Sequence, residues 1–123
     1  MKARTLVADD ASFMREMIRE IIEPEGFDVV AEAGDGTDAV TAFKEHSPDI
    51  ITMDIVMPKM SGIEAVKQII QLDPGAKIVM CSALGQEALV MEALKAGASD
   101  FIVKPFKPDA VVVTLRKALE KQD

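Results

Sequence analysis

Residues 49–62 read Asp-Ile-Ile-Thr-Met-Asp-Ile-Val-Met-Pro-Lys-Met-Ser-Gly, and the rest of the chain is arranged around them. The run Ile50–Met53 is short and apolar, and it ends in the carboxylate of Asp54. A loop with Pro58 and Gly62 follows. An apolar run bounded by turn residues predicts a buried strand. Asp54 therefore lies at the carboxyl end of a strand, the edge at which ligands bind in open α/β sheets.

The same kind of apolar run recurs along the chain. We expect strands at residues 4–8, 27–33, 50–53, 77–81 and 101–103. Apolar residues at helical spacing follow each run, which predicts helices over 13–22, 39–43, 62–70, 89–94 and 111–119. Alternating strands and helices predict an α/β fold, a doubly wound five-stranded parallel sheet with five helices on both faces. The flavodoxin-like strand order 2-1-3-4-5 satisfies the right-handed crossover rule.

The length and composition of the chain exclude several classes of protein. With 123 residues, the chain predicts a single domain over 1–123 with no output domain. The net charge is −7 and no cluster of Lys or Arg occurs, so we expect no nucleic-acid role. Cys81 is the only cysteine, which excludes a disulfide framework. No apolar run approaches the ~20 residues of a membrane helix and no signal peptide is seen, so we expect a cytoplasmic protein without membrane insertion.

Polar residues stand directly after four of the five expected strands. They are Asp9 and Asp10 after the first, Asp54 after the third, Ser82 after the fourth and Lys104 after the fifth. The carboxyl ends of parallel strands meet at one edge, so these side chains should converge. Three converging carboxylates repel one another unless a cation joins them. Oxygen ligands with room for water and phosphate suit Mg²⁺.

Each of these residues has an ordinary alternative. Asp9 or Asp10 could cap the first helix, Ser82 could cap the fourth helix, and an isolated Lys104 would be a solvated lysine. Asp54 is too far from the next helix, near Ser61, to cap it. One such residue indicates little, but five at corresponding strand ends predict a site.

The chain resembles the receiver domain of two-component response regulators over its whole length. The motifs that carry the resemblance are Asp9-Asp10, Asp54 with Met57-Pro58 and Gly62, Ser82-Ala83, and Lys104-Pro105. Residues 11–15, 53–58, 81–86 and 100–106 are similar to stand-alone chemotaxis regulators of the CheY type.

The resemblance implies roles for individual residues. Asp54 would accept a phosphoryl group from a histidine kinase, and Lys104 and Ser82 would contact that group. Asp9, Asp10, Asp54 and the Val56 backbone carbonyl would bind Mg²⁺. The switch would consist of Ser82 and Phe101.

Further implications concern the flanks of the site and the peptide bond after Lys104. Val56, Ala83 and Leu84 would flank the phosphoryl group, with Ala83 small enough to leave room for it. Val56 and Leu84 cannot hold a water by hydrogen bonds, which implies slow self-dephosphorylation. The Lys104-Pro105 bond should be cis, as is typical of the family.

The implied protein is a monomeric signalling protein rather than an enzyme. Its partners would be a histidine kinase, a flagellar motor switch protein and a phosphatase, with output through a face that includes Met91, Lys95, Phe101 and Lys107. A stand-alone receiver in another phosphorelay remains an alternative. An aspartate-based phosphohydrolase would need a second carboxylate where Val56 stands, and a flavin carrier would need a glycine-rich loop in place of Asp9-Asp10.

Overall fold

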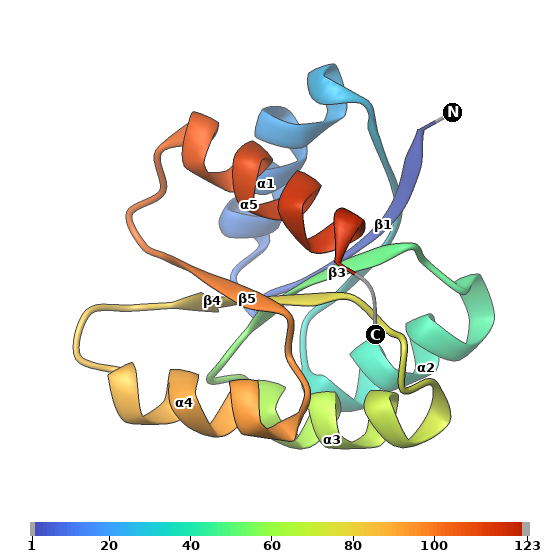
Figure 1. Cartoon of the computed structure of the whole chain (residues 1–123), viewed down its shortest axis with the longest axis vertical. Helices are drawn as coiled ribbons and strands as arrows, with labels where there is room; N and C mark the ends of the chain where they lie inside the picture. The colour runs from blue at the N-terminus through green and yellow to red at the C-terminus, as the bar shows by residue number, and fades with distance from the viewer. Residues whose placement is uncertain (1, 122–123) are drawn as a thin grey trace.

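A five-stranded parallel sheet runs through the middle of the computed structural model, which describes residues 2–121 (Figure 1). Within these residues, four α-helices and one short 3-10 helix connect the strands, and a fifth α-helix follows the last strand. In chain order the elements are β1 Ala3–Ala8, α1 Ser12–Ile22, η1 Glu23–Glu25, β2 Phe27–Ala33, α2 Gly36–His46, β3 Ile50–Asp54, α3 Gly62–Leu72, β4 Ile78–Ser82, α4 Glu87–Ala96, β5 Asp100–Val103 and α5 Pro108–Glu120.

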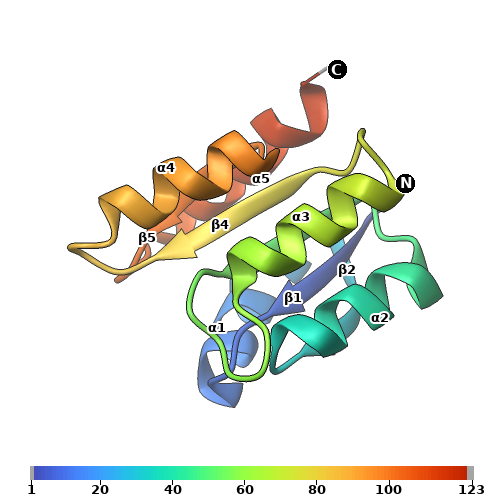
Figure 2. The ribbon, with the colours of Figure 1, turned by 90° about the horizontal axis from the view of Figure 1, so that it is seen from below.

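The strand order confirms the sequence prediction. It is β2-β1-β3-β4-β5, and every neighbouring pair is parallel. Helices α1 and α5 cover one face of the sheet, whereas α2, α3 and α4 cover the other (Figures 1 and 2). The expected element positions are confirmed, with boundaries that differ by a few residues at some ends.

The core lies in two layers, one on each face of the sheet. The layer under α2, α3 and α4 includes Met53, Ile69 and Met80, and the layer under α1 and α5 includes Ile18 and Leu115. All residues of β3 and β4 are buried. Strands covered on both faces are expected to be apolar throughout, and this is why the run before Asp54 lacks the alternation of a half-exposed strand.

Local hydrogen bonds and glycines set the helix ends. The Asp35 carboxylate accepts a hydrogen bond from the Asp38 amide at the start of α2, and the Ser61 hydroxyl does the same for Glu64 at the start of α3. Gly97 ends α4 with a φ of 121°, a conformation that side chains disfavour. In the part of the chain that the structure describes, no helix has the length and apolar composition that crossing a bilayer requires.

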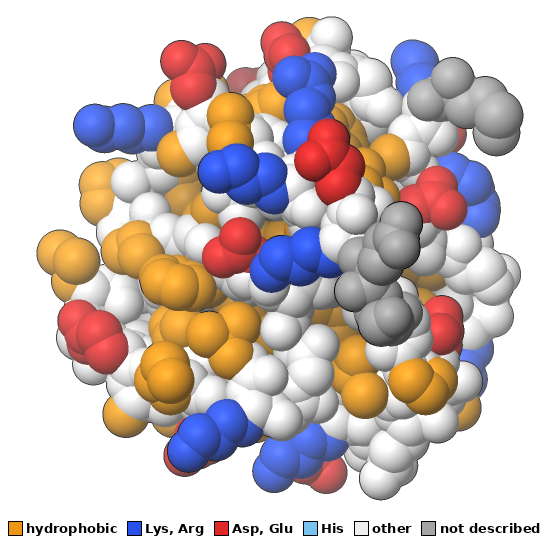
Figure 3. Space-filling model, viewed as in Figure 1, with side chains coloured by type: hydrophobic (Ala, Val, Ile, Leu, Met, Phe, Trp, Pro, Cys, Tyr) orange, Lys and Arg blue, Asp and Glu red, His pale blue; other side chains and the backbone are white. Residues whose placement is uncertain are grey.

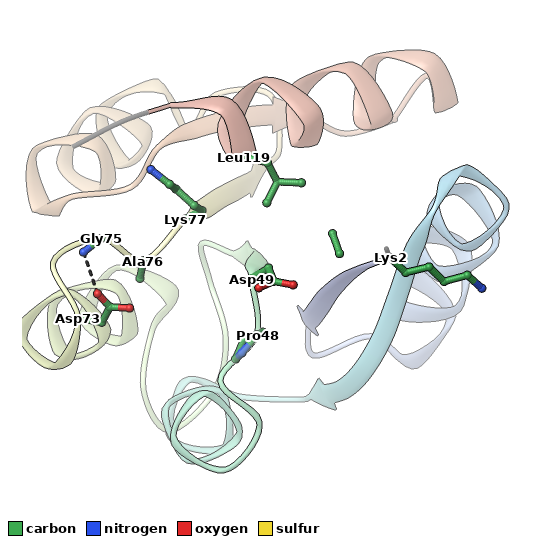
Figure 4. A pocket seen from close by; sticks show the side chains of 9 residues that line it. Lys2, Pro48, Asp49, Asp73, Gly75, Ala76, Lys77 and Leu119 are labelled. Atoms are coloured by element: carbon green, nitrogen blue, oxygen red, sulfur yellow. Dashed lines mark hydrogen bonds between the residues drawn. The ribbon is translucent and has the colours of Figure 1, made fainter.

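A hollow lies at the amino ends of the strands, away from the residues that follow the strand ends (Figure 4). Its volume is about 510 Å³, and Lys2, Asp49 and Asp73 are among its lining residues. The Asp49 carboxylate accepts from the Arg4 amide, and the Asp73 carboxylate accepts from the Gly75 amide. Both carboxylates are therefore engaged by backbone amides, Asp49 by an amide of a neighbouring strand and Asp73 by one within its own turn.

One polar atom in the core is unpaired. Among residues 2–121, the Thr52 hydroxyl is the buried side-chain polar atom without a hydrogen-bond partner. Thr52 is fully buried in β3 between Val7 of β1 and Val79 of β4. An unsatisfied buried group costs about 1–3 kcal/mol, whereas an apolar group of the same shape does not.

We therefore expect Thr52→Val to raise the free energy of unfolding by about 1 kcal/mol or more. Urea unfolding followed by circular dichroism measures it. Thr5→Val is the matched control, because Thr5 is equally buried but its hydroxyl donates to the Ala3 carbonyl at 3.1 Å. A loss of stability in Thr52→Val, or equal gains in both variants, would contradict this interpretation.

Candidate functional site

Asp54 is the last residue of β3, and a close backbone approach fixes its position. The amide of Gly62, the first residue of α3, donates to the Ile55 carbonyl at 2.8 Å. A Cβ on Gly62 would lie 1.9 Å from the Asp54 carbonyl oxygen, so only glycine lets α3 begin here. The same loop is held from the other side, because the Gly36 amide donates to the Met60 carbonyl at 2.9 Å.

Three carboxylates meet at this edge, as the sequence predicts. Each of Asp9, Asp10 and Asp54 offers one oxygen, and these oxygens all lie within 4.8 Å of one another. Asp9 is 1% exposed and Asp54 is 8% exposed, whereas Asp10 is open to solvent. Strands β1 and β3 are neighbours in the sheet, which brings the residues at their ends together.

Lys104 reaches the cluster from the end of β5. Its Nζ donates to Asp9 Oδ2 at 3.1 Å and lies 3.4 Å from Asp54 Oδ1. The sequence predicts that Lys104 converges with the carboxylates, and the structure shows that its contact with Asp9 is shorter than its contact with Asp54. The Lys104-Pro105 peptide bond is cis, as the resemblance implies.

Burial and charge shift the proton affinity of both partners. Burial, followed by the nearby charge of Asp9, raises the pKa of Asp54 from 3.8 to about 6, although Lys104 acts in the opposite direction. Burial by itself would lower the pKa of Lys104, but the carboxylates of Asp54 and Asp9 outweigh it and leave that pKa raised. At neutral pH the pair is therefore a carboxylate beside an ammonium group.

The cluster has the donor chemistry of a divalent metal site. Three hard carboxylate oxygens lie within reach of one ion, and Asp10 faces solvent where water could complete the coordination. Burial and the charge of Asp9 leave the pKa of Asp54 raised even with Lys104 in place. A bound dication would add compensating positive charge, so the residues present fit such an ion.

Ser82 ends β4 beside the cluster and does not cap α4. Its hydroxyl donates to the Ile102 carbonyl at 3.4 Å, near the limit of a hydrogen bond, and the residue before α4 is Gln86. The Gln86 side chain accepts from the Ala83 amide at 2.7 Å. Cys81 is a buried free thiol, and burial raises its pKa.

Phe101 is 39% exposed and therefore does not belong to the buried core. It lines a groove of about 250 Å³ between the loop after β4, α4 and β5, together with Ser82, Leu84, Met91 and Val103. Figure 3 shows hydrophobic side chains gathered over this part of the molecule, at the left of the view. Val56 and Leu84 are also largely exposed, so neither serves mainly to pack its loop.

Sequence reasoning did not find several residues that hold the site. The Arg15 guanidinium donates to the Asp9 backbone carbonyl at 2.6 Å, and Lys59 pairs with the buried Asp35 at 3.7 Å across the loop after β3. The sequence offers Asp9 or Asp10 as a cap of α1. Instead Asp9 Oδ1 accepts from the Ala11 amide, and no side chain caps the helix.

Comparison with known proteins agrees with this geometry. Residues 5–116 match the model of the response regulator receiver domain. The chain is 56% identical to chemotaxis protein CheY of Thermotoga maritima, covering 95% of this chain and 98% of the relative. It is also 56% identical to chemotaxis protein CheY of Bacillus subtilis, covering 97% of this chain and 99% of the relative.

Solved structures show the same architecture. The response regulator domain of Thermotoga maritima CheB has a TM-score of 0.92 with 38% identity, and all of both chains is covered. The CheX-CheY-BeF3-Mg+2 complex from Borrelia burgdorferi has a TM-score of 0.91 with 39% identity, covering 97% of this chain and 90% of the other. With the acidic cluster and Lys104 at the carboxyl edge of a 2-1-3-4-5 sheet, the chain belongs to the response regulator receiver domain family.

Proposed function

We propose that this chain is a phospho-accepting switch of chemotaxis signalling, in which Asp54 takes a phosphoryl group from a histidine kinase. The observation that carries the proposal is a buried carboxylate at the end of β3 with two further carboxylates within 4.8 Å and an ammonium group at 3.4 Å. The CheY relatives support the chemotaxis pathway. The protein is a signalling protein rather than an enzyme with a released substrate, and residues 1–123 act as one receiver domain.

The transfer step follows from the ionisation of Asp54. Its pKa of about 6 leaves it mostly ionised at neutral pH, so a carboxylate oxygen can attack the phosphorus of a phosphohistidine. A phosphorus–oxygen bond forms, the phosphorus–nitrogen bond breaks, and the imidazole nitrogen keeps the electron pair. Lys104 stabilises negative charge on the phosphoryl oxygens. Mg²⁺ held by Asp9, Asp10, Asp54 and the Val56 carbonyl would supply further positive charge when bound.

Ser82 and Phe101 would carry the signal to the surface. The long hydrogen bond from Ser82 to Ile102 is weak, so the hydroxyl can exchange it for a phosphoryl oxygen. Phe101 and Ser82 line the same groove, so a shift of Ser82 would change the packing around Phe101. A flagellar motor switch protein would bind this face as a phosphorylation-dependent partner. The proposed receiver is a monomer and acts in the cytoplasm.

Two alternatives fit less well. An aspartate-based phosphohydrolase would need a carboxylate at position 56, where Val56 stands. A non-chemotaxis phosphorelay would use the same site residues, but the CheY relatives favour chemotaxis.

The acceptor assignment is tested by labelling. We expect Asp54→Asn to abolish Mg²⁺-dependent labelling by acetyl phosphate or a phosphorylated kinase, because the amide is not a nucleophile. Asp28→Asn, an exposed change on β2, is the control and should label like the wild type. Intact-mass spectrometry measures the added phosphoryl group, and undiminished labelling of Asp54→Asn would refute the assignment.

Self-dephosphorylation should be slow, because Val56 and Leu84 offer no polar group to hold an attacking water. Val56 is 56% exposed and Leu84 is 81% exposed, so polar replacements would not disturb the core. A separate phosphatase would then end the signal; the complex of a related CheY with CheX supports such a partner.

We expect Val56→Asn, Leu84→Glu and the double variant to lose phosphate faster than the wild type, by up to ~100-fold, the scale set by ~1 Å in the placement of a reacting group. Phosphate release from labelled protein in Mg²⁺ measures the rate. Val113→Asn makes the same change at an exposed valine of α5 and should leave the rate unchanged. Polar variants that hydrolyse no faster would show that these flanks do not set the rate.

A further inference from the structure

Arg15 of α1 joins the acidic corner to the edge strand of the sheet. Its Nη1 donates to the backbone carbonyl of Asp9 at 2.6 Å, and its Nε donates to Glu32 Oε1 of β2 at 2.9 Å. A guanidinium presents several donors in a rigid fork, so one side chain can make both bonds at once. Only part of the Arg15 side chain, 20%, is exposed.

Glu32 is held in place from a second direction. Arg19, one turn further along α1, also donates to the Glu32 carboxylate and pairs with Glu23 at 3.3 Å. Burial would raise the pKa of Glu32, but the hydrogen bonds from Arg19 and Arg15 outweigh it and lower that pKa. The Glu32 carboxylate is thus held in place by two arginines, and Arg15 links it to the Asp9 carbonyl.

Every polar group of Asp9 is engaged by the protein. Its amide donates to the Ala33 carbonyl at 2.9 Å. One carboxylate oxygen accepts from the Ala11 amide and the other from Lys104. The contact with Arg15 satisfies the carbonyl. The backbone and side chain of Asp9 are therefore positioned by protein hydrogen bonds alone.

The Arg15 contact has a consequence for the neighbouring Asp10. The Asp9 carbonyl and the Asp10 amide belong to one planar peptide unit, so fixing the carbonyl fixes the plane from which the Asp10 side chain departs. Asp10 is open to solvent, so the plane of this peptide unit is one of the constraints on the direction in which its side chain starts.

We propose that Arg15 is a positioning residue that aims the Asp10 carboxylate at the cation site through the Asp9–Asp10 peptide. The inference rests on the Mg²⁺ site of the proposed function and adds a residue that touches neither metal nor phosphoryl group. Outer partners that orient metal ligands typically affect metal affinity about 10–100-fold.

Charge alone predicts the opposite sign. Removing a cation near a dication site should strengthen Mg²⁺ binding, because like charges repel. Removing a positioning contact should weaken it. The direction of the change in affinity therefore separates the two effects.

The experiment compares Arg15→Ala with Arg19→Ala in Mg²⁺ titrations by isothermal calorimetry and amide NMR. The chain has no Trp or Tyr, so intrinsic fluorescence is not a useful probe. Both variants remove one positive charge and one partner of Glu32 from the same helix, but only Arg15 contacts Asp9. We expect Arg15→Ala to weaken Mg²⁺ binding about 10-fold and Arg19→Ala to leave it unchanged or slightly tighter.

Two further measurements separate a change in Mg²⁺ affinity from a loss of folding or of the phosphoryl site. Arg15→Lys keeps the positive charge on a single ammonium group, so it should weaken Mg²⁺ binding less than Arg15→Ala does. It also replaces Arg15→Ala in the test if Arg15→Ala does not fold. Labelling of Arg15→Ala by acetyl phosphate should recover at saturating Mg²⁺, because Asp54 and Lys104 are untouched. Urea unfolding without metal checks that each variant is folded.

Affinity in Arg15→Ala that equals or exceeds the wild type overturns the inference while leaving the metal site intact. Equal weakening in Arg15→Ala and Arg19→Ala also overturns it, because the shared Glu32 network would then be the cause. Absence of Mg²⁺ binding in the wild type would overturn both this inference and the metal site of the proposed function.

Discussion

Burial of acidic groups at one strand edge, together with repulsion among three carboxylates and offset by a single lysine, is the constraint on which the rest of this molecule depends. Asp9, Asp10 and Asp54 lie within 4.8 Å of one another, and Lys104 contacts the two that are buried. Burial, followed by the charge of Asp9, raises the pKa of Asp54 from 3.8 to about 6 even with Lys104 in contact. The lysine therefore compensates the cluster only in part.

The sign of this effect fixes how stability should respond to pH. The folded state holds a proton on Asp54 at pH values where the unfolded chain has lost it. Metal-free protein is therefore stabilised by Asp54 protonation below about pH 4, and loses that contribution as pH rises through about 6. A cation bound among these carboxylates would oppose this effect, because positive charge favours the ionised form of Asp54.

The fold has to hold the carboxylates against this repulsion. The parallel pairing of β1 with β3 sets the strand ends side by side, and Gly62 lets α3 begin against the Asp54 carbonyl. On the opposite flank Arg15 and Glu32 tie the Asp9 carbonyl to β2. These contacts lie at the edge of two apolar core layers. The free energy that holds the carboxylates close together therefore comes from apolar burial elsewhere in the domain.

Much of this was predictable from the sequence, for identifiable reasons. Apolar runs ending in Asp54 and Ser82 mark strand ends, and a parallel sheet brings strand ends together whatever the loops do. The contacts of Arg15 with Asp9 and of Gln86 with Ala83 were not predictable, because they depend on side-chain torsions and on the docking of α1 against β2. The exposure of Phe101 likewise depends on how β5 and α4 pack at the sheet edge.

Carbon-13 NMR titration of the Asp54 carboxyl group in metal-free protein tests the central claim most directly. The account predicts an apparent pKa of about 6. It also predicts that Asp9→Asn lowers this value, because the repulsion of Asp9 is then removed. An Asp54 pKa near 4 in the wild type, unchanged in Asp9→Asn, would contradict the claim that burial and carboxylate repulsion together raise the pKa of Asp54.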